Sequence, residues 1–436
     1  MKLRITEKMW KGLCEDLLDR KDVETAGILL GESIQTPNGD VVIIRQAFAV
    51  PDDAYTVRKI DQLSIDPISF NRLTKIARDK QWSVFTIHTH PQARDAWFSK
   101  ADDVGDARLM PSLHCQIPGA LHGSIVLTSS GDIAVRVFDD TARSTEMSMQ
   151  IIGKSIVTSR LSVGSKEEWF IRQELALGGA GQTKLRNLRV GIVGLGGIGS
   201  LVSMQLSHLG ISELVLIDGD IVEASNVSRI VGARKDNAGS SSKVDVAADY
   251  AESLGLSTKI ERYPYYLSAK HESLIASCDV VMSCVDTHSA RALLNRYSYK
   301  YHVPIIDLGT VFRVNNTGLI VSDAGRVVTI GPGRPCLGCW GHIDANAIRI
   351  ESLSPEDIEN EVNEGYIDGA NVDQPSVISF NTYVAGAGVT ELLRLVTRFA
   401  GAESPPNRLA FSFHEGVVRR NSLAGNPRCS ICGDIC

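Results

Sequence analysis

Residues 189–200 read RVGIVGLGGIGS, and this stretch decides the expected fold of the second half of the chain. The apolar run at its start is typical of a buried strand, and the closely spaced glycines after it mark a tight turn into a helix. Glycines at such a turn let the backbone and the helix N-terminus approach a phosphate group closely. The stretch therefore predicts a strand, a phosphate-binding turn and a helix in direct succession.

The segments that follow repeat this alternation of strand and helix. Apolar stretches occur at residues 213–220 (ELVLIDGD), 279–286 (DVVMSCVD) and 303–309 (VPIIDLG), with helix-length segments between them. This rhythm predicts an α/β domain with a parallel, doubly wound sheet, which we assign to residues 166–436. Cys278 and Cys284 lie on or beside these strands, where a free cysteine usually packs as a small hydrophobic residue, so we assign both to the core.

Polar residues after these strands distinguish between two kinds of nucleotide chemistry, hydride transfer with a nicotinamide cofactor and nucleotidyl transfer. Asp218 ends the strand that follows the glycine turn, where dinucleotide-binding folds place an acid on the ribose, so a nicotinamide-dependent dehydrogenase is one interpretation. Cations near phosphates and a spare carboxylate for magnesium instead favour nucleotidyl transfer. The sequence supplies such groups at Asp220, Asn226, Arg229, Lys243 and Asp286. Each residue alone could be a surface charge or a turn cap. The prediction of nucleotidyl transfer depends on all of them occurring in this order.

In this order the residues resemble the ThiF/MoeB/ubiquitin-activating superfamily, from about residue 169 to the end of the chain. Members of that superfamily adenylate the C-terminal carboxylate of ubiquitin-like proteins with ATP and Mg²⁺. The resemblance implies that Asp218 holds the ribose, that Asp286 holds magnesium, and that Asp220 belongs to the nucleotide site. It further implies phosphate contacts from Asn226, Arg229 and Lys243, and a phosphate loop made of Gly194, Gly196, Gly197 and Gly199.

Residues 170–190 (FIRQELALGGAGQTKLRNLRV) resemble the N-terminal helix of the same superfamily, from which an arginine reaches into the active site of the partner subunit. Arg172 stands at this place, so the resemblance implies a catalytic arginine and a homodimer. The string Leu177-Gly178-Gly179 imitates the tail of a ubiquitin-like protein, but it lies in mid-chain. We predict that it forms a turn.

Two C-x-x-C pairs lie far apart in the second half of the chain. Cys336 with Cys339, and Cys429 with Cys432, together provide four thiolates, the ligand set of a closed, structural zinc site. The superfamily has a zinc knot at these positions. We therefore expect one structural Zn²⁺.

The first part of the chain has a different pattern. Short apolar runs such as 26–31 (AGILLG), 41–50 (VVIIRQAFAV) and 123–130 (GSIVLTSS) accompany one helical stretch at 70–80 (FNRLTKIARDK). They predict a small mixed α/β domain over residues 1–140. Residues 141–165 are rich in Ser, Thr and charge, and we assign them to a linker.

Within this first domain, residues 81–91 read QWSVFTIHTHP. Period-two alternation places His88 and His90 on one face at the end of a strand, a geometry that suits zinc. Asp102, at the apparent start of a helix, would close a third coordination position and leave a fourth for water. Ser99 and Asp102 also fit a capping box, and paired histidines often serve only as polar strand ends.

The complete string H-T-H-P, seven residues, Ser, two residues, Asp resembles the JAMM signature of the JAB/MPN metalloprotease family, over about 140 residues. The resemblance implies that His88, His90 and Asp102 hold a catalytic Zn²⁺ and that Ser99 steadies the oxyanion. That family places a distant glutamate ahead of a glycine-containing apolar strand as the general base. Glu24 in VETAGILLG fits this context, whereas nearby Glu32 has no such context.

One superfamily feature is missing. Many activating enzymes carry a cysteine in the crossover loop after the first C-x-x-C, but residues 340–428 contain none. The activated protein would then pass directly to a separate conjugating enzyme, or form an ester on a hydroxyl, or reach Cys436 at the end of the chain. The candidate hydroxyls belong to Ser352, Ser354 and Ser376.

Composition restricts the remaining function classes. The chain has 436 residues, 43% of them hydrophobic, which is enough for two cores. Its net charge of -6 does not indicate binding to nucleic acid or to an anionic membrane. The N-terminus lacks a signal-peptide core, and no apolar stretch reaches the ~18 residues of a membrane span, so we expect a cytoplasmic protein.

The sequence thus predicts an enzyme that activates a ubiquitin-like protein and is fused to a zinc peptidase that matures or deconjugates it. The resemblance is closest to prokaryotic ubiquitin-like conjugation systems, some of them linked to phage defence. The alternatives are activation of a sulfur carrier for cofactor or metabolite synthesis, adenylation of a small peptide, and a non-catalytic scaffold that binds a ubiquitin-like protein.

Overall fold

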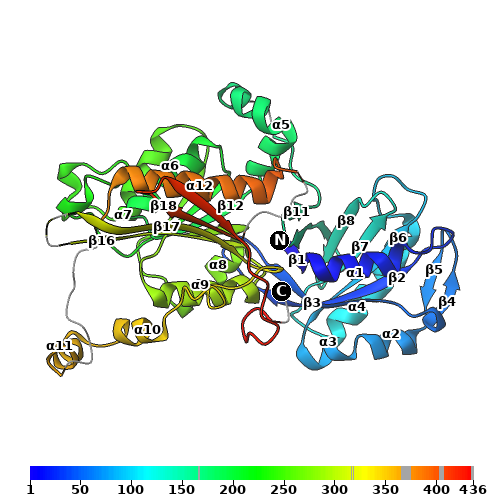
Figure 1. Cartoon of the computed structure of the whole chain (residues 1–436). Helices are drawn as coiled ribbons and strands as arrows, with labels where there is room; N and C mark the ends of the chain where they lie inside the picture. The colour runs from blue at the N-terminus through cyan, green and yellow to red at the C-terminus, as the bar shows by residue number, and fades with distance from the viewer. Residues whose placement is uncertain (165–166, 316, 318, 365–374, 402–406, 434–436) are drawn as a thin grey trace. The chain divides into compact units, whose positions relative to one another are not determined.

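A computed structural model describes the chain except for residues 165–166, 316, 318, 365–374, 402–406 and 434–436. The fold divides into two units with separate cores, Met1–Ser162 and Val163–Cys436 (Figure 1). Within the described ranges, no helix combines the length and apolarity that a bilayer crossing requires.

The first unit is built on a nine-stranded sheet with the order β11-β10-β1-β3-β2-β6-β7-β8-β9. Its elements are β1 (Lys2–Thr6), α1 (Glu7–Leu18), β2 (Ala26–Ile34), β3 (Val41–Ala49), the 3-10 helix η1 (Asp52–Ala54), β4 (Tyr55–Arg58), β5 (Leu63–Ile65), α2 (Pro67–Leu73), α3 (Lys75–Lys80), β6 (Ser83–His90), α4 (Lys100–Gln116), β7 (His122–Thr128), β8 (Ile133–Phe138), β9 (Ser144–Glu146), β10 (Ser148–Ile152) and β11 (Ile156–Thr158).

Helices cover both faces of this sheet because its strands alternate between two apolar cores. Leu13 of α1 packs with Leu29 of β2 on one face. On the other face, Val84 of β6 packs with Met110 of α4. Period two carries His88 of β6 to the same face as Val84, which is the face that α4 covers. The alternation of β6 thus turns His88 toward the N-terminus of α4, where its Nε2 lies 3.0 Å from Asp102 Oδ1.

Two expectations for this part of the chain need correction. The expected linker 141–165 contains β9, β10 and β11, and β10 pairs in parallel with β1, so the first unit extends to Ser162. Its apolar residues, such as Met149, fill the core beside β1, although Ser and Thr dominate the local composition. The helix expected at 70–80 is two short helices, since Thr74 leaves the helical conformation between α2 and α3.

The second unit is built on an eight-stranded sheet with the order β14-β13-β12-β15-β16-β17-β18-β19. Its elements are η2 (Glu168–Phe170), α5 (Ile171–Leu185), β12 (Arg189–Val193), α6 (Gly197–His208), β13 (Glu213–Ile217), η3 (Ala224–Asn226), η4 (Lys235–Asn237), α7 (Lys243–Ser253), β14 (Lys259–Tyr263), η5 (Ala269–His271), α8 (Glu272–Ser277), β15 (Val280–Ser283), α9 (His288–Lys300), β16 (Ile305–Val314), β17 (Ile320–Ile330), α10 (Ala345–Glu351), α11 (Pro355–Asn363), α12 (Ile378–Thr397), β18 (Arg408–Ser412) and β19 (Val417–Asn421).

The sheet of the second unit is parallel only in its first half. Strands β14, β13, β12, β15 and β16 run parallel, as the alternation of strand and helix predicts. Strands β17, β18 and β19 extend the same sheet antiparallel. Helices α6, α7 and α12 lie on one side of the sheet and α8 and α9 on the other (Figure 1).

The parallel strands are fixed at their N-terminal ends by a buried ion cluster. The Arg189 side chain is 2% exposed and lies 2.6 Å from both Glu213 of β13 and Glu261 of β14. It therefore joins three adjacent strands. The opposite, carboxyl ends of β12, β13 and β15 carry the glycine turn, Asp218 and Asp286, which brings these residues to one edge of the sheet.

Two smaller predictions for this unit have mixed outcomes. Gly178 interrupts α5 with a positive φ of 73°, so the Leu177-Gly178-Gly179 string forms a kink between two helical segments instead of a free turn. Cys278 is fully buried, as expected. Cys284 is only partly core, because it also lines the cavity described below.

Candidate functional site

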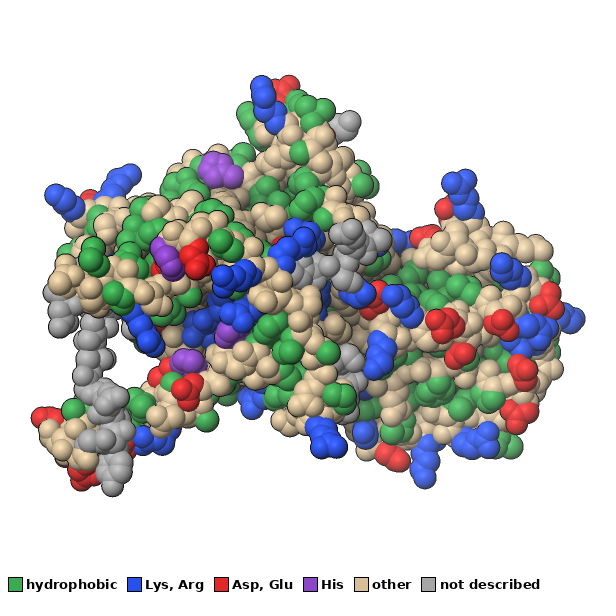
Figure 2. Space-filling view, in the orientation of Figure 1, with side chains coloured by type: hydrophobic (Ala, Val, Ile, Leu, Met, Phe, Trp, Pro, Cys, Tyr) green, Lys and Arg blue, Asp and Glu red, His purple; other side chains and the backbone are tan. Residues whose placement is uncertain are grey.

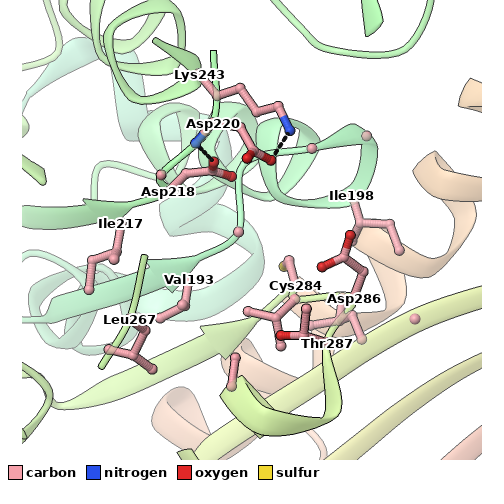
Figure 3. A pocket seen from close by; sticks show the side chains of 18 of the residues that line it. Val193, Ile198, Ile217, Asp218, Asp220, Lys243, Leu267, Cys284, Asp286 and Thr287 are labelled. Atoms are coloured by element: carbon pink, nitrogen blue, oxygen red, sulfur yellow. Dashed lines mark hydrogen bonds and ion pairs between the residues drawn. The ribbon is translucent and has the colours of Figure 1, made fainter. Parts of the chain in front are cut away.

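A cavity of about 560 Å³ lies at the carboxyl edge of the parallel strands, next to the turn between β12 and α6. It collects the polar residues singled out in the sequence together with an apolar wall. Figure 3 shows Asp218, Asp220 and Lys243 on one side, Val193, Ile217 and Leu267 on another, and Asp286 with Thr287 opposite them. Asn226, Arg229, Gly194, Gly196 and Gly197 also line it.

The glycines of this turn differ in why the structure requires or allows them. Gly194 has a φ of +87°, which favours glycine, and a Cβ there would lie 2.6 Å from the carbonyl oxygen of Cys284. A Cβ on Gly199 would lie 1.8 Å from the Gly194 oxygen, so the close contact of α6 with the turn requires a glycine. A Cβ on Gly196 would meet nothing within 4 Å. Gly196 precedes α6, whose first backbone N–H groups lack partners within the helix.

Asp218 and Asp220 are hydrogen-bonded to each other next to the glycine turn. Asp218 accepts hydrogen bonds from the backbone N–H of Leu195 at 2.6 Å and of Asp220 at 2.8 Å, and its burial raises its pKa. The Asp220 carboxylate lies 2.7 Å from Lys243 Nζ and accepts a hydrogen bond from the Tyr266 hydroxyl. Burial opposes the charge of Asp220, but these two donors outweigh it and lower the pKa of the carboxyl. Lys243 is therefore held at the cavity by an acid.

Asn226 and Arg229 reach the cavity from the segment after β13. The Asn226 amide oxygen accepts a hydrogen bond from the Glu223 backbone N–H, so this side chain also closes a local turn. Arg229 donates to the Ser225 carbonyl at 2.8 Å, and its Cδ would lie 3.4 Å from a Cβ on Gly197. Arg229 thus lies beside the phosphate loop expected from the sequence, and Asn226 lines the same cavity.

The loop that carries Asp286 is held by a residue that sequence reasoning missed. Arg291 donates to the carbonyls of Val285 at 2.5 Å and Asp286 at 3.2 Å, and its Nε lies 3.3 Å from the fully buried Asp307. Glu351 of α10, also missed, accepts from the first backbone N–H groups of α9 at 2.7 and 2.8 Å. No local motif marks either residue, because the acid that pairs with Arg291 lies on β16 and the partners of Glu351 lie on α9.

The proposed hydroxyl acceptors differ in position. Ser376 lines the cavity and accepts a hydrogen bond from Asn381 Nδ2 at 3.0 Å, whereas Ser352 and Ser354 are not among the described lining residues. Ser354 caps α11. Cys436 lies outside the described residues.

Arg172 is exposed on α5 and is not among the residues that line the cavity of its own chain. The neighbouring apolar side chains Trp169, Ile171 and Leu175 are 69%, 53% and 84% exposed. Hydrophobic side chains are visible on α5 in the space-filling view (Figure 2). The superfamily resemblance implies that Arg172 acts in the site of a second copy, and its exposure leaves it accessible to one.

The four cysteines of the two C-x-x-C pairs converge. Sγ atoms lie 3.8 Å apart for Cys336 and Cys339, 3.7 Å for Cys336 and Cys429, and 3.6 Å for Cys339 and Cys432. A tetrahedron with Zn–S bonds of about 2.3 Å has edges of about 3.8 Å, while a disulfide bond is only about 2.0 Å long. The backbone N–H of Cys432 lowers the pKa of Cys429 to about 7. The donor set fits a structural zinc ion.

His88, His90 and Asp102 also converge in the first unit. The two Nε2 atoms lie 3.1 Å apart, and His88 Nε2 lies 3.0 Å from Asp102 Oδ1. Tetrahedral zinc with bonds of about 2.0–2.1 Å requires donor separations of about 3.3 Å, close to these values. Asp102 also forms the capping box with Ser99, accepting from the Ser99 N–H at 2.6 Å while its own N–H donates to Ser99 Oγ at 3.2 Å. The cap therefore orients the carboxylate toward His88.

Of the two candidate glutamates, the structure brings Glu24 to the histidines. Glu24 Oε1 lies 3.9 Å from His90 Nε2, and burial raises the pKa of this carboxyl. Its backbone is held by a hydrogen bond from the Glu24 N–H to the Lys59 carbonyl at 2.8 Å. Glu32 instead lies 3.1 Å from Arg45.

The profile of the ThiF family matches residues 170–431, more than half of the chain. The chain belongs to the ThiF family. The match begins close to the start of the second unit. The Rossmann-like sheet of this unit carries the cavity described above.

Curated relatives of this ThiF-family chain include the adenylyltransferase and sulfurtransferase uba4 of Aspergillus clavatus, with 32% identity over 262 residues. That match covers 59% of this chain and 49% of uba4. The SAMP-activating enzyme E1 of Haloferax volcanii is 32% identical over 165 residues, or 37% of this chain and 57% of that enzyme. The chain thus spans about half the length of the curated relatives it matches.

Two crystal structures of E. coli MccB, one with MccA-N7isoASN and one with ATP, each match with a TM-score of 0.50. The sequence identities are 21% and 20%, and each match covers 62% of this ThiF-family chain and 75% of MccB. At this identity the likeness shows the fold of the second unit.

Proposed function

We propose that the second unit adenylates the C-terminal carboxylate of a ubiquitin-like protein with MgATP. The observation that carries this proposal is the cavity that joins the glycine turn, Asp218, Lys243 and Asp286 at one sheet edge. Membership of the ThiF family and the names of the uba4 and SAMP-activating relatives support it.

Each residue has a role that follows from its position. The N–H groups at the start of α6 and the cations Arg229 and Lys243 would bind the phosphates. Asp218 would accept from the ribose hydroxyls, and Asp286 would hold magnesium. The substrate carboxylate attacks the α-phosphorus of ATP, and pyrophosphate leaves. Asp220 keeps the Lys243 ammonium in place until phosphates arrive.

The proposal includes a homodimer in which Arg172 serves the partner's cavity. Its exposed position on α5, beside apolar side chains that are also exposed, supports this arrangement. A separate conjugating enzyme would receive the activated protein, since the segment after the first C-x-x-C has no cysteine.

ATP–pyrophosphate exchange tests this function, with a small protein that ends in a Gly-rich tail as substrate; we expect such a protein among the products of the neighbouring genes. Exchange should require that protein and should fall at least about 100-fold in Asp286→Ala and Arg172→Ala. Arg143→Ala, which removes an exposed arginine of the first unit, is the matched control and should retain full exchange. Exchange that proceeds equally in Asp286→Ala would contradict the site assignment.

We also infer that the first unit is a JAMM-type zinc peptidase that cleaves at the C-terminus of the same ubiquitin-like protein. The convergence of His88, His90 and Asp102 beside a buried glutamate supports it. Zinc held by these three residues would supply an activated water. Glu24 would take the proton from that water, and Ser99 would donate to the developing oxyanion.

A pair of matched variants tests the peptidase. Glu24→Gln should lose cleavage of a C-terminally extended precursor by at least about 100-fold, because it removes the base. Its zinc content should remain unchanged, since Glu24 is not among the expected ligands. Glu32→Gln, a change of the same kind on the same segment, should cleave normally. Equal cleavage by both variants would refute the role of Glu24.

A second candidate is activation of a sulfur carrier, favoured by the sulfurtransferase activity named for uba4. The two candidates differ in product. Mass spectrometry of the small protein after reaction would show a thiocarboxylate for a sulfur carrier, and an isopeptide conjugate for a modifier.

A further inference from the structure

The cavity is also lined by an aromatic side chain that no sequence motif marked. Tyr266 follows β14 and lines the cavity with Asp218, Asp220 and Lys243. Its side chain is 70% exposed, so burial in a core does not explain its position. Its neighbours Tyr265 and Leu267 line the same cavity, but the Tyr265 ring is stacked on His271 with centroids 4.0 Å apart.

Two contacts hold the Tyr266 ring in place. Its hydroxyl donates a hydrogen bond to Asp220, the carboxylate that also pairs with Lys243. The ring itself packs against the backbone of Gly219, where an added Cβ would lie 2.6 to 2.7 Å from three ring carbons. Gly219 therefore permits an approach that any larger residue would block. One ring face is packed in this way, and most of the side chain stays open.

The surroundings of Tyr266 match the needs of a nucleotide base. Val193, Ile217 and Leu267 form an apolar wall, and Asp218 and Lys243 lie beside it (Figure 3). A base requires apolar surroundings and a partner for its flat face, whereas the ribose and phosphates require the acid and the cations. Aromatic side chains supply that partner by stacking, which strengthens binding of the base and leaves the phosphates unaffected.

We propose that Tyr266 is a base-contacting residue of this cavity, with its ring against the adenine of bound ATP and its hydroxyl fastened to Asp220. The assignment rests on the proposed adenylation function, because it requires ATP in this cavity. It gives Tyr266 a role distinct from that of Lys243: one side chain acts on the base, and the other acts on the phosphates.

Binding of MgATP and of inorganic tripolyphosphate to the full chain, measured by isothermal titration calorimetry, separates these roles. Tyr266→Ala should weaken MgATP binding roughly tenfold and leave tripolyphosphate binding within about twofold of the unaltered protein. Tyr266→Phe keeps the ring on Gly219 and should bind MgATP within about threefold. Tyr383→Ala, which truncates a 55% exposed tyrosine of α12 that is absent from the described lining residues, is the control and should bind both ligands normally.

Three outcomes would overturn the assignment. Tyr266→Ala could bind MgATP as tightly as the unaltered protein, or it could lose MgATP and tripolyphosphate to the same extent, which indicates a structural role. Equal losses in Tyr266→Phe and Tyr266→Ala would show that the hydroxyl, and not the ring, carries the effect. Absence of MgATP binding in the unaltered chain would refute the proposed adenylation itself, and the two failures are thereby distinguishable.

Discussion

Gly196 precedes α6 and Gly199 lies in the first turn of this helix, and their replacement by alanine should have opposite consequences. In Gly199→Ala the new Cβ would lie 1.8 Å from the Gly194 carbonyl oxygen and 3.3 Å from Cys284 Cβ. Neither the backbone oxygen nor the strand beneath it can move without shifting α6. In Gly196→Ala the Cβ meets no atom within 4 Å, so the folded chain accommodates it.

The magnitudes follow from these contacts. Overpacking of a tight interface costs about 1–3 kcal/mol, and contact with a backbone atom places Gly199→Ala at about 3 kcal/mol. For a unit of this size we expect the melting temperature of the second unit to fall by about 6–12 °C. Gly196→Ala should melt within about 2 °C of the unaltered protein, because surface changes without clashes stay within about 0.5 kcal/mol. It should nevertheless lose MgATP binding at least about tenfold, since its methyl group fills the space in which a phosphate approaches the backbone.

Differential scanning calorimetry and titration with MgATP measure the two effects on the same samples. If Gly199→Ala melts like the unaltered chain, the close contact between α6 and the turn does not constrain the fold. If Gly196→Ala binds MgATP normally, the open space at Gly196 does not belong to a phosphate site. A loss of stability in both variants would show that the turn has only a structural function.

Three further predictions concern metal content and stability. Cys429→Ser should lower the zinc content by one ion per chain, measured by inductively coupled plasma mass spectrometry, whereas Cys115→Ser, at an exposed cysteine, should not. Arg189→Met leaves Glu213 and Glu261 without their buried cation and should cost about 3 kcal/mol, while Lys259→Met in the same cluster, 57% exposed, should cost at most about 1 kcal/mol in urea unfolding. Ser99→Ala removes the cap of α4 and should cost about 1 kcal/mol, with Ser99→Thr close to unaltered in calorimetry; equal melting of Ser99→Ala and the unaltered chain would contradict the cap.

Local sequence patterns were enough to predict the structures that depend only on residues close together in the chain. The strand, turn and helix of residues 189–200 follow from a run of apolar residues and from glycines with fixed spacing. The two histidines of β6 emerge together because strand side chains alternate with a period of two. The contact between Asp102 and Ser99 spans three residues at a helix start, a separation that local capping rules predict.

Tertiary structure decided whatever depends on residues that are distant in sequence. Cys336 meets Cys429 only because the chain returns to that point after β19, and Arg291 finds Asp307 only because β16 pairs beside β15. Strands β9 to β11 looked like a linker by composition, and pairing of β10 with β1 places them in the first sheet. Tyr266 reaches the cavity because Gly219 and Asp220 on another loop give its ring a surface and its hydroxyl an acceptor. Such contacts form when the burial of the sheets brings distant segments together. The C-x-x-C spacing predicted that the cysteines are ligands, whereas no local periodicity or spacing marks Arg291 or Tyr266.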